Sequence, residues 1–419
     1  MTITFLIAEI TVEPGWAVGA VPTDDPSVDR DLLLDADGRP WVPGSALAGS
    51  LRAHLRQHDA QHGTEFDTTL MGSRPPIQRG DTTEASPLWI LGTHFTPDPA
   101  SGDLTEIVGQ TAVDRRRGAA IPTSLRYSRS VAAGGTLTAY LRHDGPLTDD
   151  HLQVLAAWQP AIGRDRTTGG GQARLTRLLH GTIDPTTADG MRTWLHHTGH
   201  ALIEAVAIHQ ILPGPPPQPW LETDLHIVDA ILVCDPRPTG PAQPRTRDSQ
   251  PFVPGSAWKG LFRGRVEYIL RSRYGLHATC GQPTGCGTCP TCHVFGHPGG
   301  RGRLVFHDSP IFDAQQPAAR THVAIDRVTG GAHDGLFYQS APVTAGRLRL
   351  RIDTLTDVPP WVATVIQHVL RDLHDGLIGL GSHTSRGMGT LRLDSRPTPG
   401  PVTIPELAPT PDTAEGPAK

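Results

Sequence analysis

The feature that most constrains this chain is a sixteen-residue segment that occurs twice. Residues 37–52 read DGRPWVPGSALAGSLR and residues 248–263 read DSQPFVPGSAWKGLFR, and nine of the sixteen positions are identical. Chance readily supplies a Pro-Gly pair, but it does not supply the shared VPGSA run. The chain must therefore fold in a way that uses this segment in two places.

Further landmarks follow each copy of this segment in the same order. AVDR at residues 112–115 corresponds to AIDR at residues 324–327, and a later Ala-Gly pair also recurs. A glycine-rich stretch closes each half, at residues 163–171 and 379–389, and leads into a strand-like segment. A nearly constant spacing between equivalent landmarks is what a repeated structural unit requires. The sequence therefore predicts two tandem modules.

These landmarks predict the domain boundaries. We expect a first module over residues 1–185, a helix and proline-rich linker over 186–219, a second module over 220–397 and a disordered tail over 398–419. The linker helix is expected at about residues 188–210, because the proline run that follows cannot continue a helix. The tail lacks the apolar periodicity of a folded segment.

Composition and charge narrow the class of protein. Hydrophobic residues make up 37% and aromatic residues 5% of the 419 positions, with 46 glycines and 40 prolines. This mix favours β-rich modules with many loops. The formal net charge of −5 argues against a protein that coats nucleic acid with a uniformly basic surface. No apolar run approaches the length of a membrane span, so a cytoplasmic protein without membrane contact is expected.

The repeated Pro-Gly-Ser element is predicted to open a helix in each module. Ser45 and Ser256 lie where a helix N-cap belongs. The free amide groups and positive dipole end of such a helix form a natural seat for phosphate. An alternative is a capped helix packed on a sheet, with its basic side chains in solvent. The basic residues that would extend the phosphate seats are Arg52, Arg56, Lys259 and Arg263.

The two glycine-rich stretches are predicted to be loops that approach a phosphate backbone. Glycine allows such an approach, and successive amides can form an anion-binding nest. Because the loops occupy equivalent positions in both halves, they favour one shared ligand. The candidate RNA-binding residues are Arg164, Arg166, Gly169 and Gly170 in the first loop, and His383, Ser385, Arg386 and Gly387 in the second.

An arm is predicted between the helix and the glycine loop of each module. Residues 320–337 alternate apolar and polar positions on either side of a turn, as in a β-hairpin. The counterpart at residues 112–122 carries Arg115, Arg116 and Arg117, and the second arm carries Arg327. Such an arm can grip or wedge a nucleic-acid strand; the alternative is a hairpin that is simply solvated.

Four of the five cysteines fall within thirteen residues, at Cys280, Cys286, Cys289 and Cys292. Cys-x2-Cys steps suit tetrahedral zinc, and disulfides are not expected in a reducing compartment. We therefore predict a structural zinc site with no open catalytic position. His277 or His293 is an alternative ligand in place of Cys280.

The Pro-Gly-Ser helix start, the IDRVTGGA arm and the SRGMG loop together resemble the RAMP superfamily of type III CRISPR effectors. The resemblance is strongest to the backbone subunit that follows guide RNA, here with two units fused in tandem. It implies an α+β fold of two ferredoxin-like, RRM-type modules with inserted β-hairpin thumbs, the second module carrying a zinc knuckle. The partners it implies are CRISPR guide RNA, single-stranded target RNA and other subunits of the effector complex.

In members of this family that cut target RNA, an aspartate lies in a loop before the Pro-Gly-Ser helix. Asp29 falls at that place in the first module, with Asp31 as the second choice. Together with Mg²⁺ or another divalent cation, such a carboxylate can support strand scission. An acidic surface loop is the alternative. The second module has no aspartate at the matching distance, since Asp235 lies too far upstream.

Four functions remain open on the sequence. The first is a guide-binding subunit whose first module cleaves target RNA, and the second is the same scaffold without chemistry. The third is an endoribonuclease that matures the guide precursor, which usually needs a general acid and base. The fourth is a zinc-stabilised, β-rich binding protein for some other ligand.

Overall fold

The computed structural model describes residues 2–19, 25–74, 82–99, 102–234, 240–404 and Leu407. The chain forms two compact units. Residues 1–107, 127–166 and 170–218 make up the first unit, and residues 108–126, 167–169 and 219–419 make up the second. Two short segments of the first repeat therefore group with the second unit. None of the described helices combines the length and the apolar character needed to cross a bilayer.

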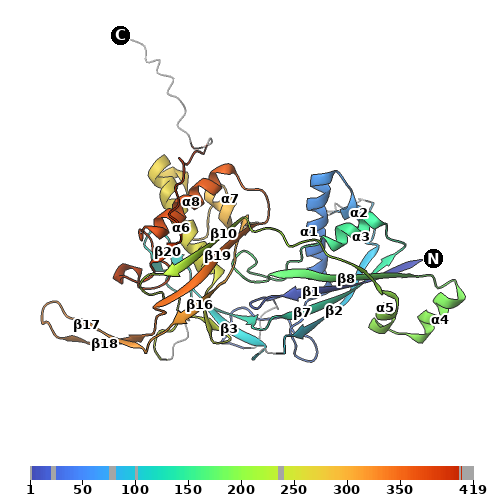
Figure 1. Cartoon of the computed structure of the whole chain (residues 1–419), viewed down its shortest axis with the longest axis horizontal. Coiled ribbons are helices and arrows are strands. Elements are labelled where there is room, and N and C mark those ends of the chain that lie inside the picture. The colour runs from blue at the N-terminus through green and yellow to red at the C-terminus, as the bar shows by residue number, and fades with distance from the viewer. Residues whose placement is uncertain are drawn as a thin grey trace, which may run out of the picture. The chain divides into compact units, whose positions relative to one another are not determined.

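The first unit is an antiparallel sheet with helices on both faces. Strand β7 pairs with β1 on one side and with β2 on the other, and β8 runs alongside β1 (Figure 1). The order across the sheet is therefore β8-β1-β7-β2. The elements of this core follow one another as β1 (Ile3–Val12), α1 (Gly44–His62), β2 (Leu88–Pro97), β7 (Gly135–Asp144), α3 (Asp149–Ala156) and β8 (Ala173–Ile183).

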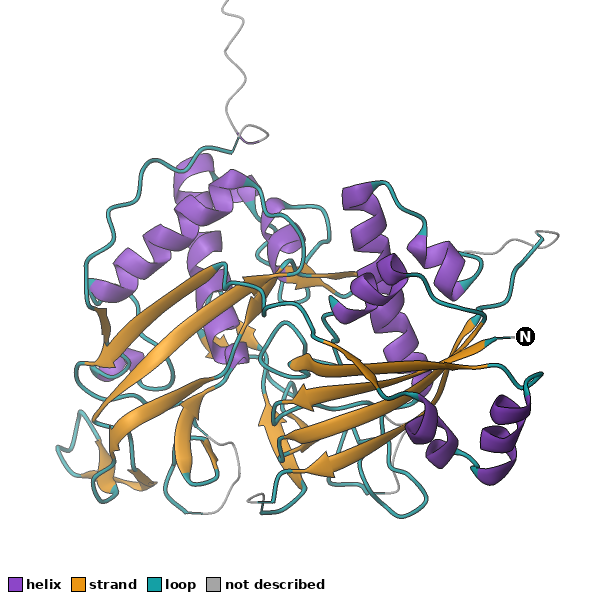
Figure 2. Cartoon of the chain, turned by 45° about the vertical axis from the view of Figure 1, so that its right-hand side comes forward, coloured by secondary structure: helices purple, strands orange, loops and turns teal. Residues whose placement is uncertain are grey.

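Strand β1 is buried on both faces because helices cover each side of the sheet (Figure 2). Leu6 and Ile10 point to the core shared with α1 and α3. Phe5 and Ile7 point the other way, toward α5 (His200–Val206). Successive side chains of a strand alternate between faces, so a strand covered on both sides reads as a nearly continuous apolar run.

The second unit repeats this order of elements. Strand β19 lies between β16 and β10, and β20 pairs with the far edge of β10. Helices α6 and α8 cover one face of this sheet (Figure 1). The elements are β10 (Leu221–Ile227), α6 (Gly255–Tyr274), β16 (Ser309–Gln315), β19 (Ala345–Thr354), α8 (Pro360–His374) and β20 (Leu391–Leu393). The order β20-β10-β19-β16 corresponds strand by strand to that of the first unit, which is consistent with a duplicated ferredoxin-like core.

Both arms are inserted between equivalent core strands. The predicted hairpin at residues 320–337 is confirmed, because β17 (Arg320–Ile325) pairs antiparallel with β18 (Ala332–Ser340). The first arm is more divided, with an inner pair of short strands at its tip. Its strands are β3 (Thr105–Gln110), β4 (Val113–Asp114), β5 (Ala119–Ala120) and β6 (Arg126–Val131).

Shorter elements complete the chain. The helical ones are α2 (Phe66–Met71), α4 (Ala188–His196), α7 (Pro290–Phe295), and the 3-10 turns η1 (Leu276–Ala278) and η2 (Thr384–Arg386). The strands are β9 (His209–Ile211), β11 (Thr246–Arg247), β12 (Gln250–Val253), β13 (Gly296–His297), β14 (Gly300–Arg301) and β15 (Leu304–Phe306).

Two sequence expectations about the ends of the modules need correction. The single helix expected at about 188–210 is two helices, α4 and α5, because Gly199 adopts a positive φ of 58° between them. Part of the tail expected to be disordered packs against the core of the second unit, and Leu407 is the last described residue that does so. Val402 and Ile404 are buried, and the Tyr274 hydroxyl bonds the backbone of both residues. Residues 405–406 and 408–419 lie outside the described part of the chain.

Candidate nucleic-acid interface and metal site

The repeated helices begin two residues earlier than a serine N-cap requires. Pro43 and Pro254 are the N-cap residues, with nearly identical extended backbones (φ −66°, ψ 148° and φ −69°, ψ 145°). Ser45 and Ser256 lie inside the first turn, and neither helix has a side-chain cap bond. The predicted serine caps are therefore wrong. The rigid φ of proline sets the helix entry instead.

The two helix starts differ in what surrounds them. The first turn of α1 borders a surface pocket of about 610 Å³, lined among others by Trp41, Gly44, Ser45 and Arg52. At α6, the Gly255 amide donates to the Asp308 carboxylate at 2.8 Å. A carboxylate already at the positive end of α6 opposes a phosphate there, whereas the start of α1 is open to a ligand.

Several predicted RNA-binding side chains are engaged within the protein. Arg52 and Arg56 both pair with the fully buried Asp67, at 3.2 and 3.0 Å. Arg263 pairs with Glu267, another fully buried carboxylate, at 3.1 Å. Lys259 donates to the Thr167 hydroxyl at 2.8 Å. Buried carboxylates need such partners, so these contacts have a structural role whatever else the residues bind.

The two glycine loops have the same backbone conformation. In the first, φ is positive at Gly163, Asp165, Gly169 and Gly171. In the second, φ is positive 218 positions later in each case, at Gly381, His383, Gly387 and Gly389. The bond from the Gly170 amide to the Asp165 carbonyl (3.2 Å) recurs between the Met388 amide and the His383 carbonyl (3.3 Å). Four left-handed positions in common are a strong sign of one inherited loop.

The side chains of the first loop face inward. Arg164 donates to the Asp31 and Arg129 carbonyls at 3.0 and 2.5 Å. Burial lowers the pKa of its guanidinium. Arg166 donates to the Ala161 carbonyl at 3.4 Å. Arg164 thus ties the glycine loop to the loop that carries the candidate catalytic aspartates.

The side chains of the second loop meet the second arm. His383 lies edge-on to Tyr338 and to His322, with ring centroids 6.0 and 6.5 Å apart, and the His322 and Tyr338 rings stack at 4.8 Å. The exposed Arg386 donates to the Tyr338 hydroxyl. Burial and the nearby Arg386 charge lower the pKa of His383, which favours a neutral ring at neutral pH. Sequence reasoning missed both residues, although His322 lies in the predicted hairpin and Tyr338 directly follows it.

The arms have matching turns. The Asp114 carboxylate accepts from the Arg116 and Arg117 amides, and the Asp326 carboxylate accepts from the Val328 and Thr329 amides. The aspartate of each repeated Ala-x-Asp-Arg motif therefore forms the turn. The following arginines differ in their surroundings. Arg115 is nearly buried within the second unit, whereas Arg116 and Arg327 are exposed.

The aspartate loop of the first module separates its two candidates. Asp31 is 9% exposed and accepts from Arg129 through both oxygens, at 2.8 and 2.9 Å. Asp29 is exposed, and one carboxylate oxygen accepts from the Tyr127 amide at 2.6 Å. Asp29 is therefore the carboxylate available to a ligand, while Asp31 is committed to an ion pair.

Matching backbone bonds identify the same positions in the second module. The Arg30 amide donates to the Tyr127 carbonyl (3.2 Å), and the Ala242 amide donates to the Gln339 carbonyl (2.8 Å). Ala242 therefore corresponds to Arg30. Pro241 then stands in place of Asp29, and Gln243 in place of Asp31. Asp235 lies outside the described residues.

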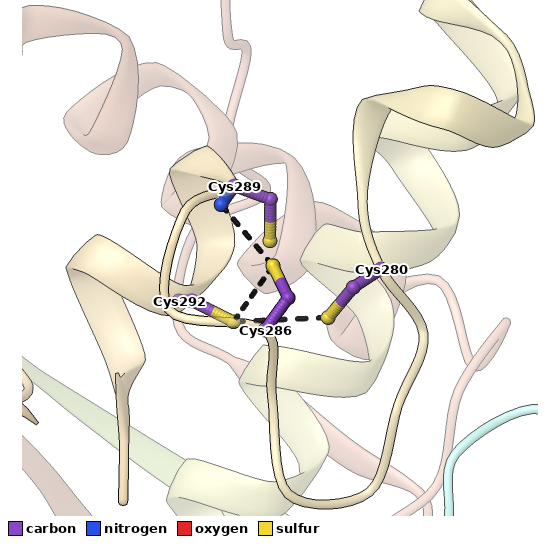
Figure 3. A group of neighbouring side chains, drawn as sticks. All are labelled: Cys280, Cys286, Cys289 and Cys292. Atoms are coloured by element: carbon purple, nitrogen blue, oxygen red, sulfur yellow. Dashed lines mark hydrogen bonds between the residues drawn. The ribbon is translucent and has the colours of Figure 1, made fainter. Parts of the chain in front are cut away.

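The cysteine cluster is compact (Figure 3). The sulfur atoms of Cys280, Cys286, Cys289 and Cys292 all lie within 4.8 Å of one another. Cys292 Sγ is 3.7 Å from that of Cys280 and 4.0 Å from that of Cys286. Tetrahedral zinc with sulfur ligands at about 2.3 Å spaces them by about 3.8 Å. The four thiols therefore fit a metal such as zinc.

The surroundings of the cluster agree with that fit. The Thr288 hydroxyl, with the amides of Thr288 and Cys289, holds the pKa of the Cys286 thiol well below its usual range, whereas burial raises the pKa of the Cys289 thiol to about 12. Thiolate is the form that binds metal. His293 bonds the Gly287 carbonyl at 3.0 Å. Neither His293 nor His277 belongs to the group of neighbouring ligand atoms, which the four cysteine sulfurs form among the described residues.

Comparison with known proteins agrees with the duplicated architecture. The family model described as RAMP superfamily matches residues 10–174 and again residues 221–392, together more than half of the chain. No curated protein matches the sequence. The chain therefore belongs to the RAMP superfamily, a membership that implies CRISPR-associated RNA binding.

Proposed function

We propose that this chain is a backbone subunit of a type III CRISPR effector complex that holds guide RNA through two fused modules. Each module supplies a ferredoxin-like, RRM-type sheet, an inserted thumb and a glycine loop. The single observation that carries the proposal is the shared loop conformation, with left-handed residues at four matching positions. Two equivalent loops suit a ligand that itself repeats, such as a phosphate backbone.

In this proposal, sequence is read by base pairing between guide and target, and the protein follows the shape of the strand. The start of α1, the exposed Arg386 and the His322–Tyr338–His383 rings supply contacts to phosphate and to unstacked bases. The two arms supply the remaining predicted contacts to RNA. Guide RNA, single-stranded target RNA and other effector subunits are the partners.

We assign cleavage of the paired target RNA to the first module, with Asp29 as its central residue. Asp29 is exposed, and its bond to the Tyr127 amide fixes the direction of its carboxylate. A carboxylate held in this way orients the 2′-hydroxyl of the target for attack on the adjacent phosphorus. The 5′-oxygen then leaves, which gives a 2′,3′-cyclic phosphate and a 5′-hydroxyl.

A divalent cation such as Mg²⁺ would share the Asp29 carboxylate with the RNA phosphates and neutralise charge there. One protein carboxylate is enough for this role, because Mg²⁺ usually keeps several waters. The second module, with Pro241 at the corresponding position, binds without cutting. The four cysteines hold structural zinc in a knuckle that forms part of the second module.

RNA content provides the first test. The complex purified from its native host should show the absorbance ratio of a nucleoprotein at 260 and 280 nm, and sequencing should return CRISPR guides. Co-purifying RNA of any other kind, or none, sinks the guide-binding assignment. Cleavage of guide precursor by the lone chain would instead favour a maturation endoribonuclease.

The second test separates cleavage from binding. Asp29→Asn should abolish cutting of paired target RNA while guide content stays unchanged. Asp37→Asn is the matched control, because Asp37 is an exposed carboxylate in the same loop region, ahead of α1. A wild-type complex that binds target RNA but never cuts it would favour the non-catalytic scaffold.

A further inference from the structure

Arg115 of the first arm is held by the cysteine knuckle of the second repeat. Its Nε donates to the Glu267 carboxylate at 3.0 Å. Its two terminal nitrogens donate to the Pro283 and Gln282 carbonyls at 3.2 and 2.5 Å. These contacts lie within the second compact unit, which includes residues 108–126. The side chain is only 12% exposed, so this is a fixed contact rather than a surface encounter.

Two of the three acceptors of Arg115 lie between the metal ligands. Gln282 and Pro283 lie in the loop between Cys280 and Cys286, and both are exposed. A loop with little buried surface cannot hold one shape by packing, so its order comes from its ends. The backbone also approaches the arm closely there. A Cβ at Gly281, where φ is 60°, would lie 2.6 Å from Arg116 Nε.

A second path joins the arm to the cluster through Glu267, which is fully buried. Arg263 donates to Glu267 at 3.1 Å and to the Cys292 sulfur at 3.4 Å. Arg271 lies 3.7 Å from the same carboxylate. An unbroken chain of polar contacts thus runs from Cys292 through Arg263 and Glu267 to Arg115.

The side chains that meet at Glu267 carry an excess of positive charge. Three guanidinium groups surround Glu267, whose single negative charge leaves two positive charges in excess. Zinc held by four thiolates carries two net negative charges, which offset that excess. Partly buried like charges repel, so an excess of positive charge that is not offset opposes the docking of Arg115. Arg115 belongs to an inserted arm and is the member of this group that can leave.

We infer that zinc occupancy of the four-cysteine site fixes the first arm, with Arg115 and Glu267 as the positioning residues. With zinc bound, the arm is docked on the knuckle; without zinc, Arg115 loses its Gln282 and Pro283 acceptors and the arm is released. The inference rests on the zinc site proposed above, but not on RNA binding or cleavage. It makes the geometry of the first arm depend on the metal state of the other repeat.

The test is hydrogen–deuterium exchange of the full chain, with zinc content measured in parallel. Removing zinc with a chelator under reducing conditions should speed exchange of residues 108–126 about tenfold, the effect of losing a charged hydrogen-bond network. Residues 320–340, the equivalent arm, are the internal control. Arg327 is the counterpart of Arg115 there; it is exposed and has no partner among the described residues. Adding zinc back should restore slow exchange.

Two variants sharpen the test. Arg115→Gln should bind zinc with wild-type stoichiometry, yet exchange quickly at residues 108–126 even when zinc is present. Arg117→Gln is matched to it and should behave as wild type, since Arg117 pairs with Asp114 inside the arm. Zinc-independent exchange at residues 108–126 in the wild type would overturn the inference, as would full zinc sensitivity in Arg115→Gln.

Two other outcomes also count against it. If zinc removal loosens residues 108–126 and strand β10 equally, the metal supports the whole unit rather than the arm. If the chain binds no zinc, this inference and the proposed zinc site fail together, while the RNA assignment is judged separately by its own tests.

Discussion

The guanidinium of Arg129 donates to both oxygens of the Asp31 carboxylate, at 2.8 and 2.9 Å. The same guanidinium also bonds Asp25 at 2.6 Å. Only two residues from Asp31, Asp29 is exposed. Of these two neighbouring aspartates, Asp31 is held in an ion pair, whereas Asp29 is open to a ligand.

This division predicts that two similar substitutions change the stability of the fold by different amounts. Asp31→Asn leaves Arg129 without its main counter-charge, and we expect it to lower the free energy of unfolding by about 2 kcal/mol. Asp29→Asn should change stability by less than about 0.5 kcal/mol, as is usual for an exposed residue. Thermal and denaturant unfolding of the two variants measure the difference. Equal destabilisation by both would show that Asp29 is structural as well.

Replacing Pro241 tests whether cleavage depends on one position. Because Pro241 corresponds to Asp29, Pro241→Asp places a carboxylate at the equivalent point of the second module. We expect one additional cut in paired target RNA, at a fixed spacing from the first. Pro241→Ala is the control for loss of the proline ring. An unchanged cleavage pattern, with Pro241→Asp still bound to guide, would mean that the carboxylate alone does not make a cutting module.

Sequence reasoning reached the duplication and the α+β class through short motifs that recur along the chain, and it reached the hairpin arm and the cysteine cluster because each depends on residues close together. It misplaced the helix caps, since it weighed the hydrogen-bonding serines above the rigid prolines. Sequence reasoning also did not identify Asp67 and Glu267 as buried carboxylates. Local sequence gives no sign that Arg115 will find Glu267, because 152 positions separate them and only the tertiary fold brings them together.

The turn of the second arm should be sensitive to acid. The Thr329 and Val328 amides donate to Asp326 and lower its pKa. A lowered pKa in the folded state means that this contribution is complete above the ordinary carboxyl value of about 3.9. It is lost as the pH falls through the lower value of the folded turn. We therefore expect the amides of Val328 and Thr329 to lose protection only below about pH 4.

Amide exchange between pH 6 and pH 3, corrected for intrinsic rates, measures this effect. Asp326→Asn keeps an acceptor oxygen and should remove the pH dependence while retaining part of the protection. Asp326→Ala should lose protection at every pH. Loss of protection in the wild type already at pH 6 would contradict the assignment of Asp326 as the turn-forming group.

The cysteine cluster should bind one divalent metal per chain. Cobalt substituted for zinc should give the intense visible bands of a tetrahedral site and the charge-transfer absorption of thiolate ligands. Cys292→Ser should abolish both signals, because Cys292 lies between Cys280 and Cys286 in the cluster. Cys234→Ser is the control, since Cys234 lies away from the cluster and contacts Ser382. Bands typical of mixed nitrogen and sulfur ligands would instead bring in a histidine.

Substitutions of the arginines at the two glycine loops should affect different properties, stability in the first loop and RNA binding in the second. Arg164 is half-buried and donates to backbone carbonyls, so Arg164→Ala should cost about 2 kcal/mol of stability. Arg386 is exposed at the second loop. Arg386→Ala should leave stability nearly unchanged, weaken binding of single-stranded RNA about fivefold and reduce the salt dependence by about 0.7 in the logarithmic slope. Binding titrations at several salt concentrations measure both quantities. A weaker affinity with an unchanged salt slope would show that Arg386 acts by supporting the Tyr338 ring rather than by meeting a phosphate.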